Sequence, residues 1–204
     1  MRGMTVLVLD ARWPQMVPVD VAQRLVGPLE FTAEVPISVR WSLNPASTVG
    51  TPWLVTTDPD DPQVRERAAA GDEILTVPSL QDPVAEAVRV MGQARRRGEW
   101  ERTMSHEKLV PYLREETAEL AEAIESEASD EALKKELSDV LLQVLFHAEI
   151  AAEREAFDFA DVAAAFVEKM RVRAPYFFDG STGLVDVETQ ERLWAEGKAR
   201  EQAE

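Results

Sequence analysis

The 204-residue sequence contains no cysteine. This absence excludes disulfide bonds, catalysis by a thiolate and zinc sites built on cysteine. Long hydrophobic runs are also missing: no apolar stretch approaches the roughly 20 residues that a membrane-spanning helix needs. The N-terminal TVLVL is too short for a signal peptide and is soon followed by Asp10. We therefore expect a cytoplasmic protein that does not enter a membrane.

Positive charge is scarce in this sequence. There are 38 acidic and 22 basic residues, which gives a formal net charge of −16. Such a charge opposes the phosphate contacts by which proteins bind long nucleic acids, so a DNA or RNA polymer is disfavoured as a partner. Most of the carboxylates are expected to serve solubility. The functional question is which few of them do something else.

Residues 1–80 predict a small α/β unit. Short apolar runs of strand length occur at MTVLVLD, PWLVTTD and EILTVP, and FTAEVPISVRW alternates in part like a strand. Between them, VDVAQRLVG and PDDPQVRERAAAG indicate short helices, each followed by a glycine. No glycine-rich phosphate loop is present, so we interpret this unit as a docking or assembly module.

Residues 83–204 predict a second domain, which makes the chain mainly α-helical. Ser105 and Ser129 are candidate N-caps, and Pro175 is placed to end a helix. Helical periodicity covers about 83–97, 105–127, 129–154 and 158–173, and a final helix, weakened by Gly197, covers 188–204. Four helices joined by short loops predict a helical bundle.

Two acidic motifs border the apolar stripes of neighbouring helices. REETAEL carries Glu115, Glu116 and Glu119, and KELSDV carries Glu136 and Asp139. With helical spacing, each group lies at the edge of the apolar face of its own helix. An antiparallel pair of these helices brings both acidic edges into one crevice. The carboxylates would repel one another unless a cation neutralised them, and the hard ions Mg²⁺ and Mn²⁺ prefer such oxygen ligands.

Other interpretations of these residues stay open on the pattern alone. Glutamates at this spacing are also common on solvated helices. A di-iron carboxylate site is disfavoured, because it expects Glu-x-x-His on two helices and neither His106 nor His147 has a glutamate three residues before it. His147 and Gln143 project close to the Glu136 edge, where they either line the crevice or are satisfied at the margin of the bundle.

Three consecutive segments resemble a known family. LVPYLREETAELAEAI, KKELSDVLLQVLFHAEIA and FDFADVAAAFVEKMRVRAP resemble, in order, the helices of MazG-type nucleoside triphosphate pyrophosphohydrolases, whose signature is EExxE followed by ExxD. GEWERTMSHEKL resembles the segment before them, with Met104 where glutamine is usual. The resemblance covers about residues 90–200 and one MazG domain. The β-rich start is similar, more weakly, to the N-terminal extension of actinobacterial and mycobacterial members.

This resemblance implies an all-α enzyme that hydrolyses nucleoside triphosphates to the monophosphate and pyrophosphate. It implies dependence on Mg²⁺, with Mn²⁺ as a substitute, and a homodimer or larger homo-oligomer. It suggests that Glu116 or Glu119 activates water. The residues implied in metal binding are Glu115, Glu116, Glu119, Glu136 and Asp139, and those implied in substrate binding are Lys169, Arg173, Trp194 and Lys198. Clearance of non-canonical or damaged nucleotides is a further suggestion, with the preferred base and sugar left open.

A second class of function is a non-catalytic module. In this alternative, an acidic helical bundle binds nucleotide or metal without turnover, or merely forms an oligomer. The intact spacing of the five acids favours the enzyme, because a scaffold has no need of carboxylates at the margin of its core.

Overall fold

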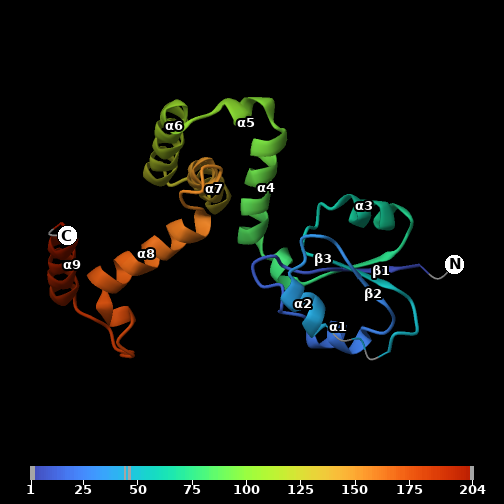
Figure 1. Ribbon diagram of the computed structural model, residues 1–204. Helices are drawn as coiled ribbons and strands as arrows, with labels where there is room; N and C mark the ends of the chain where they lie inside the picture. The colour runs from blue at the N-terminus through green and yellow to red at the C-terminus, as the bar shows by residue number, and fades with distance from the viewer. Residues whose placement is uncertain (1–2, 44, 46, 203–204) are drawn as a thin grey trace. The chain divides into compact units, whose positions relative to one another are not determined.

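The computed structural model describes residues 3–43, 45 and 47–202 of the chain (Figure 1). The chain divides into two compact units, residues 1–87 and 88–204. The sequence predicts this division between residues 80 and 83. No helix in the described part of the chain is both long and apolar enough to cross a bilayer.

A parallel sheet of four strands forms the core of the N-terminal unit. Its order is β2-β3-β1-β4, and Thr5 of β1 pairs with Trp53 on one side and with Glu73 on the other. The strands are β1 Thr5–Val8, β2 Leu29–Phe31, β3 Trp53–Thr56 and β4 Glu73–Thr76. β1, β3 and β4 lie in the apolar runs that were predicted to be strands.

Helices cover both faces of this sheet. Successive residues of a strand point to opposite faces. Leu7 therefore packs on one face with Val21 of α1 and Val39 of α2, whereas Val6 packs on the other with Val64 of α3. The helices are α1 Val19–Arg24, α2 Ile37–Ser42 and α3 Pro62–Ala69. Burial on both faces explains why β1 is a continuous apolar run.

The segment FTAEVPISVRW differs from its prediction as a partly alternating strand. Only Phe31 belongs to β2, and α2 begins at Ile37, directly after Pro36. Pro36 has no N–H to donate to a sheet, and its φ of −59° suits a position that leads into a helix. Val35 and Val39 are both buried. The partial alternation therefore arises from a loop followed by a short helix.

The C-terminal unit is helical. Its elements are α4 Pro83–Arg97, which begins in the N-terminal unit, α5 Glu99–Thr103, α6 His106–Glu125, α7 Asp130–Ala152, α8 Phe159–Arg173 and α9 Val187–Glu201. Two 3₁₀ turns, η1 Pro78–Gln81 and η2 Pro175–Phe177, precede α4 and follow α8. α4, α6, α7 and α8 agree with the predicted helices within two residues at each end. α5 was not predicted, and residues 203 and 204, where the final predicted helix ends, lie outside the described residues.

Side-chain caps fix where the long helices begin. The hydroxyl of Ser105 accepts a hydrogen bond from the Lys108 backbone, and the hydroxyl of Ser129 accepts one from the Ala132 backbone. Asp158 begins α8 with a capping box, because its side chain and that of Asp161 each accept from the other residue's backbone N–H. These caps set the register in which the helices present their acids.

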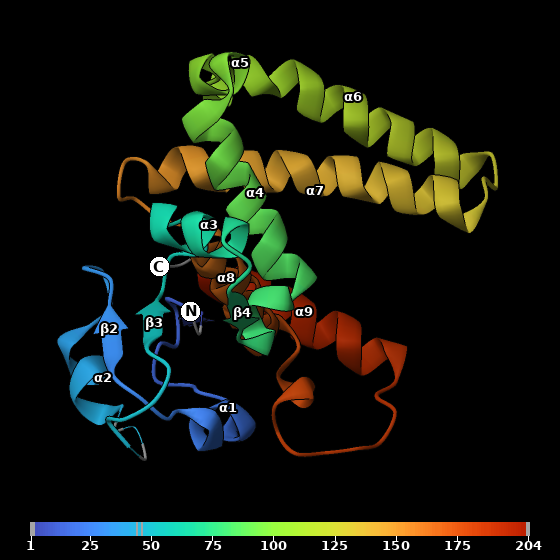
Figure 2. The ribbon, with the colours of Figure 1, turned by 90° about the vertical axis from the view of Figure 1, so that its right-hand side faces the viewer.

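The α6–α7 hairpin is the centre of the C-terminal unit. The two helices run antiparallel, side by side (Figure 2). Arg95 of α4 secures one end of the hairpin: only 7% exposed, it forms an ion pair with Glu153, just after α7, and donates to the carbonyl of Met104, just before α6, at 3.1 Å. The beginning of α6 is thereby held near the end of α7.

α8 and α9 form a second pair, in close backbone contact at Gly197. A Cβ at this buried glycine would lie 2.7 Å from the carbonyl oxygen of Val172 and 2.9 Å from Cα of Arg173. The sequence suggested that Gly197 weakens the helix. The structure gives it a packing role, because only a residue without a side chain allows the two helices to approach this closely.

Candidate metal centre

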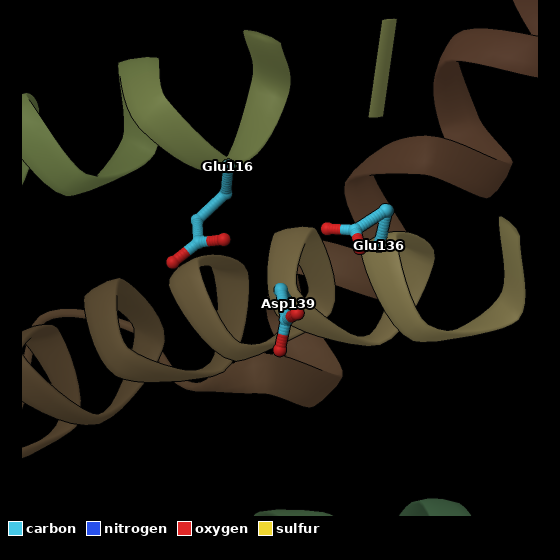
Figure 3. Close-up of side chains that lie close together, drawn as sticks. All are labelled: Glu116, Glu136 and Asp139. Atoms are coloured by element: carbon cyan, nitrogen blue, oxygen red, sulfur yellow. The ribbon is translucent and has the colours of Figure 1, made fainter. Parts of the chain in front are cut away.

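Three carboxylates from two helices converge in the α6–α7 hairpin. Glu116 extends from α6 toward α7, where Glu136 and Asp139 stand one turn apart (Figure 3). One carboxylate oxygen from each of the three lies within 4.8 Å of the others. The antiparallel pairing of the helices thus brings an acid of REETAEL next to both acids of KELSDV.

The electrostatics of Glu116 reflect this crowding. Loss of hydration raises the pKa of the Glu116 carboxyl, and the negative charges of Asp139, Glu119 and Glu115 raise it further, while Lys135 acts in the opposite direction. A raised pKa means that the fold disfavours the ionised form of Glu116. A cation bound among these acids would reverse that preference.

Glu115 and Glu119 occupy a different position from the other acids. Both side chains are exposed on α6, next to Glu116, and both are close enough for their charges to act on it. The group whose oxygens converge consists of Glu116, Glu136 and Asp139. Of the five predicted metal-binding residues, the structure therefore brings three together and leaves two as exposed neighbours.

Lys135 contacts two of the converging acids. Its Nζ lies 3.0 Å from Oε1 of Glu136 and 3.1 Å from Oδ2 of Asp139. The other carboxylate oxygen of Glu136, Oε2, is buried and accepts no hydrogen bond within the described part of the chain. An unpartnered, buried carboxylate oxygen is costly unless a cation or a donor satisfies it, so the set of oxygen donors fits a hard cation.

The polar side of α7 continues beyond the acids to Gln143 and His147. Gln143 is 4% exposed. Its Oε1 and the Nε2 of His147 are buried and have no hydrogen-bond partner among the residues that the structure describes. Gln143 is thus buried and His147 partly buried, on the same side of α7 as Glu136 and Asp139.

A pair of histidines joins the ends of α6 and α7, and the sequence did not predict it. The Nδ1 atoms of His106 and His147 are 2.8 Å apart, and a guanidinium nitrogen of Arg154 lies 3.2 Å from Nε2 of His106. Burial lowers the pKa of His147, and the charge of His106 lowers it further. His106 stands at the start of one helix and His147 late in the next. Their contact can be predicted only if the two helices are assumed to pair antiparallel.

The predicted substrate-binding residues lie on the α8–α9 pair. The guanidinium of Arg173 donates from Nε to Oε1 of Glu201 at 3.1 Å and lies 5.2 Å from the ring centre of Trp194. Lys198 is exposed, one turn beyond Trp194. The structure therefore brings Arg173 and Trp194 together, on helices other than those that carry the acids.

Lys169 lines an open hollow beside α8. The hollow has a volume of about 510 Å³ and is lined by Phe157, Asp161, Val162, Ala165, Phe166 and Lys169. Its walls are largely apolar, with the ammonium and one carboxylate as the charged groups. Lys169 lies one turn before Arg173: a hydrogen bond from Arg173 lowers the pKa of the Glu201 carboxyl, and the charges of Arg173 and Lys169 lower it further.

Two parts of this sequence match known protein families. A sequence profile described as the MazG nucleotide pyrophosphohydrolase domain matches residues 104–178, and one described as the MazG N-terminal domain matches residues 4–75. The chain belongs to the MazG family. The family predicted from EExxE and ExxD is confirmed.

Several curated proteins are similar to this MazG chain. A nucleoside triphosphate pyrophosphohydrolase of Mycolicibacterium smegmatis is 41% identical over 206 residues, which cover 97% of this chain and 63% of the relative. One of Mycobacterium tuberculosis is 38% identical over 208 residues, covering 98% and 63%. A Thermotoga maritima protein named nucleoside triphosphate pyrophosphohydrolase/pyrophosphatase MazG is 48% identical over 103 residues, covering 50% and 38%. The chain thus spans 63% of the length of each mycobacterial relative.

The MazG domain match contains most of the candidate residues. Residues 104–178 include the five acids, Lys169 and Arg173, whereas Trp194 and Lys198 lie beyond the match. The match to the N-terminal domain covers nearly all of the parallel sheet.

Proposed function

We propose that this MazG protein hydrolyses nucleoside triphosphates to the monophosphate and pyrophosphate. The observation that carries the proposal is the convergence of Glu116, Glu136 and Asp139 within a matched MazG domain. The names of the mycobacterial relatives support it. The proposal includes a cytoplasmic location, where nucleotides are made and used, and clearance of non-canonical or damaged nucleotides as the purpose of the reaction.

The metal ion in this proposal is Mg²⁺, with Mn²⁺ as a substitute. Glu116, Glu136 and Asp139 would hold it, with Glu115 and Glu119 nearby. The donors are all carboxylate oxygens, and Oε2 of Glu136 is buried without a partner among the described residues. Loss of hydration, and then repulsion by the neighbouring acids, raise the pKa of Glu116, and a cation would relieve that repulsion. When bound, such an ion stabilises charge on phosphoryl oxygens and lowers the pKa of a bound water.

The proposed reaction is a displacement at phosphorus. The oxygen of a water molecule forms a bond to the α or β phosphorus, and the bridging P–O bond breaks with its electron pair on the departing phosphate group. A carboxylate takes the proton from the water. We assign this role to Glu119 in preference to Glu116, because Glu119 lies beside the converging acids and not among them. Both remain in the proposed catalytic pair.

Binding of the triphosphate is assigned to cations of α8 and α9. Lys169 and Arg173 are proposed to contact phosphate oxygens, with Lys198 as a further cation and Trp194 packing near the base. Arg173 is already paired with Glu201. A phosphate group would therefore have to replace that carboxylate, which requires the end of α9 to shift or the guanidinium to turn.

We also propose that the protein works as a homodimer or larger homo-oligomer. Four large apolar side chains of α7 are exposed by 36–52%: Leu137, Leu141, Leu142 and Val144. They occupy the same helix as two of the converging acids. Large apolar side chains exposed on one helix are costly in water, and a second copy of the chain is the proposed cover.

The test is to incubate the protein with a panel of nucleoside triphosphates and Mg²⁺ and to identify the phosphate products by ³¹P NMR. Pyrophosphate and the monophosphate should accumulate together, and excess chelator should stop the reaction. Orthophosphate as the first product, or full activity in chelator, would contradict the proposal. Nucleotide binding without any product would favour the non-catalytic module.

A further inference from the structure

Lys135 is the cation that the chain itself supplies to the acidic cluster. Its Nζ bridges Oε1 of Glu136 and Oδ2 of Asp139, at 3.0 and 3.1 Å. Its charge also acts on Glu116, on the facing helix. A single lysine therefore offsets part of the repulsion among all three converging carboxylates.

Lys135 contacts two of the three carboxylates that would hold a metal ion. Glu136 and Asp139 each offer one oxygen to the lysine, and Oε2 of Glu136 is left buried without a partner in the described part of the chain. An ion held by Glu116, Glu136 and Asp139 cannot share these positions freely with an ammonium group, because the two cations repel one another at such distances. Binding of the ion and pairing of Lys135 are therefore in competition.

The side chain of Lys135 can also separate readily from the two carboxylates. Its side chain is 65% exposed, whereas those of Glu136 and Asp139 are 14% and 30% exposed. Ion pairs with an exposed, flexible lysine are weak, and a divalent ion attracts the same carboxylates with twice the charge. The α6–α7 hairpin fixes the positions of the acids, whereas the flexible side chain of Lys135 can move its ammonium group into solvent.

We propose that Lys135 is a resident counter-ion, which neutralises the acidic cluster before metal binds and is displaced when a divalent ion enters. It thereby sets the affinity of the centre for the ion. This inference rests on the proposed metal-dependent function of the same centre. It adds a residue that directly precedes ExxD, contacts both of its acids and acts on metal binding by competition and not by coordination.

The chain offers a matched control in the preceding residue. Lys134 pairs with Glu131, and no contact of Lys134 with the cluster acids is found among the described residues. Lys135→Met and Lys134→Met remove the same charge from neighbouring positions of the same helix. Lys135→Arg keeps the charge at the bridging position.

The experiment is a titration of each protein with Mn²⁺ at low ionic strength and without nucleotide, with free Mn²⁺ measured by electron paramagnetic resonance. Lys135→Met should bind Mn²⁺ about three- to tenfold more tightly than wild type, the scale of two weak surface ion pairs. Lys134→Met should change the Kd by less than about twofold, through general electrostatics alone. Lys135→Arg should stay within about twofold of wild type.

Three results would overturn the inference. Unchanged or weaker binding in Lys135→Met, while wild type binds Mn²⁺, would show that the lysine does not compete or that it preorganises the ligands. An equal gain in Mn²⁺ affinity in Lys134→Met would show that the effect comes from net charge and not from the position of Lys135. No Mn²⁺ binding by wild type would remove the metal centre itself, and with it the proposed function, which separates that failure from the first two.

Discussion

The imidazole rings of His106 and His147 lie almost parallel, with their Nδ1 atoms 2.8 Å apart. Arg154 always carries its protons, so Nε2 of His106, 3.2 Å away, must accept from it. The proton of neutral His106 then lies on Nδ1 and is donated to Nδ1 of His147, whose own proton lies on Nε2. The short contact between the rings therefore requires both histidines to be neutral.

This contact predicts a loss of stability at mildly acidic pH. Burial lowers the pKa of His147 below the ordinary value of 6.5, and a positive charge on His106 would lower it further. An unfolded chain takes up a proton near that pH, whereas the folded chain resists it. The stabilisation is thus fully present above about pH 6.5 and is lost as the pH falls through the folded pKa.

Urea unfolding of wild type and His147→Gln between pH 7.5 and 5 measures this loss. The free energy of unfolding should fall more steeply with decreasing pH in wild type than in the variant, because the glutamine does not titrate. The charged groups around the pair, Arg154 and Glu107, are present in both proteins. Parallel pH dependences would show that the histidine pair is not the titrating element.

Replacing Gly197 should destabilise the packing of α8 against α9. Gly197→Ala would place a Cβ 2.7 Å from the carbonyl oxygen of Val172. We expect it to lower the free energy of unfolding by about 1–3 kcal/mol, despite the better helix propensity of alanine. Gly183→Ala is the control, because a Cβ there meets nothing within 4 Å. Equal unfolding midpoints in urea for the two variants would mean that α9 tolerates a wider separation from α8.

Lys169→Ala should impair turnover without unfolding the protein. If the ammonium contacts a phosphate oxygen, its loss removes a charge-assisted contact of about 1.5–3 kcal/mol, which lowers kcat/KM roughly tenfold to a hundredfold. Arg171→Ala, on the same helix with its partner Glu168, should leave kcat/KM near the wild-type value. Wild-type kinetics in Lys169→Ala would show that Lys169 does not bind substrate. Its remaining role would be that of a cation that complements the macrodipole at the end of α8.

Much of the helical domain was predictable from local signals. Ser105 and Ser129 were recognised as caps, and the apolar periodicity after each gave helices that the structure reproduces within two residues. Because those starts fix the register, the meeting of EExxE with ExxD could be expected from antiparallel pairing. That Glu116, and not Glu115 or Glu119, joins Glu136 and Asp139 depends on the rotation of α6 against α7, which no local pattern specifies.

The structure differs from the sequence-based prediction where contacts join distant parts of the chain or where a helix or strand is short. The His106–His147 contact joins residues 41 positions apart, so it depends on the packing of two whole helices. β2 has three residues, and α2 follows a proline, so neither carries enough periodicity to be separated by pattern alone. The pairing of Lys135 with two acids depends on side-chain conformation and was likewise not foreseen.

The proposed pyrophosphohydrolase reaction depends on the converging carboxylates Glu116, Glu136 and Asp139. The most direct measurement is ³¹P NMR of a nucleoside triphosphate with saturating Mg²⁺ and wild type, Glu116→Gln or Glu122→Gln, with folding of each checked by circular dichroism. Glu122 lies exposed on the same helix, outside the cluster. Wild type and Glu122→Gln should release pyrophosphate at similar rates, while folded Glu116→Gln should release none in the same time. Pyrophosphate release by Glu116→Gln at the wild-type rate would contradict the account.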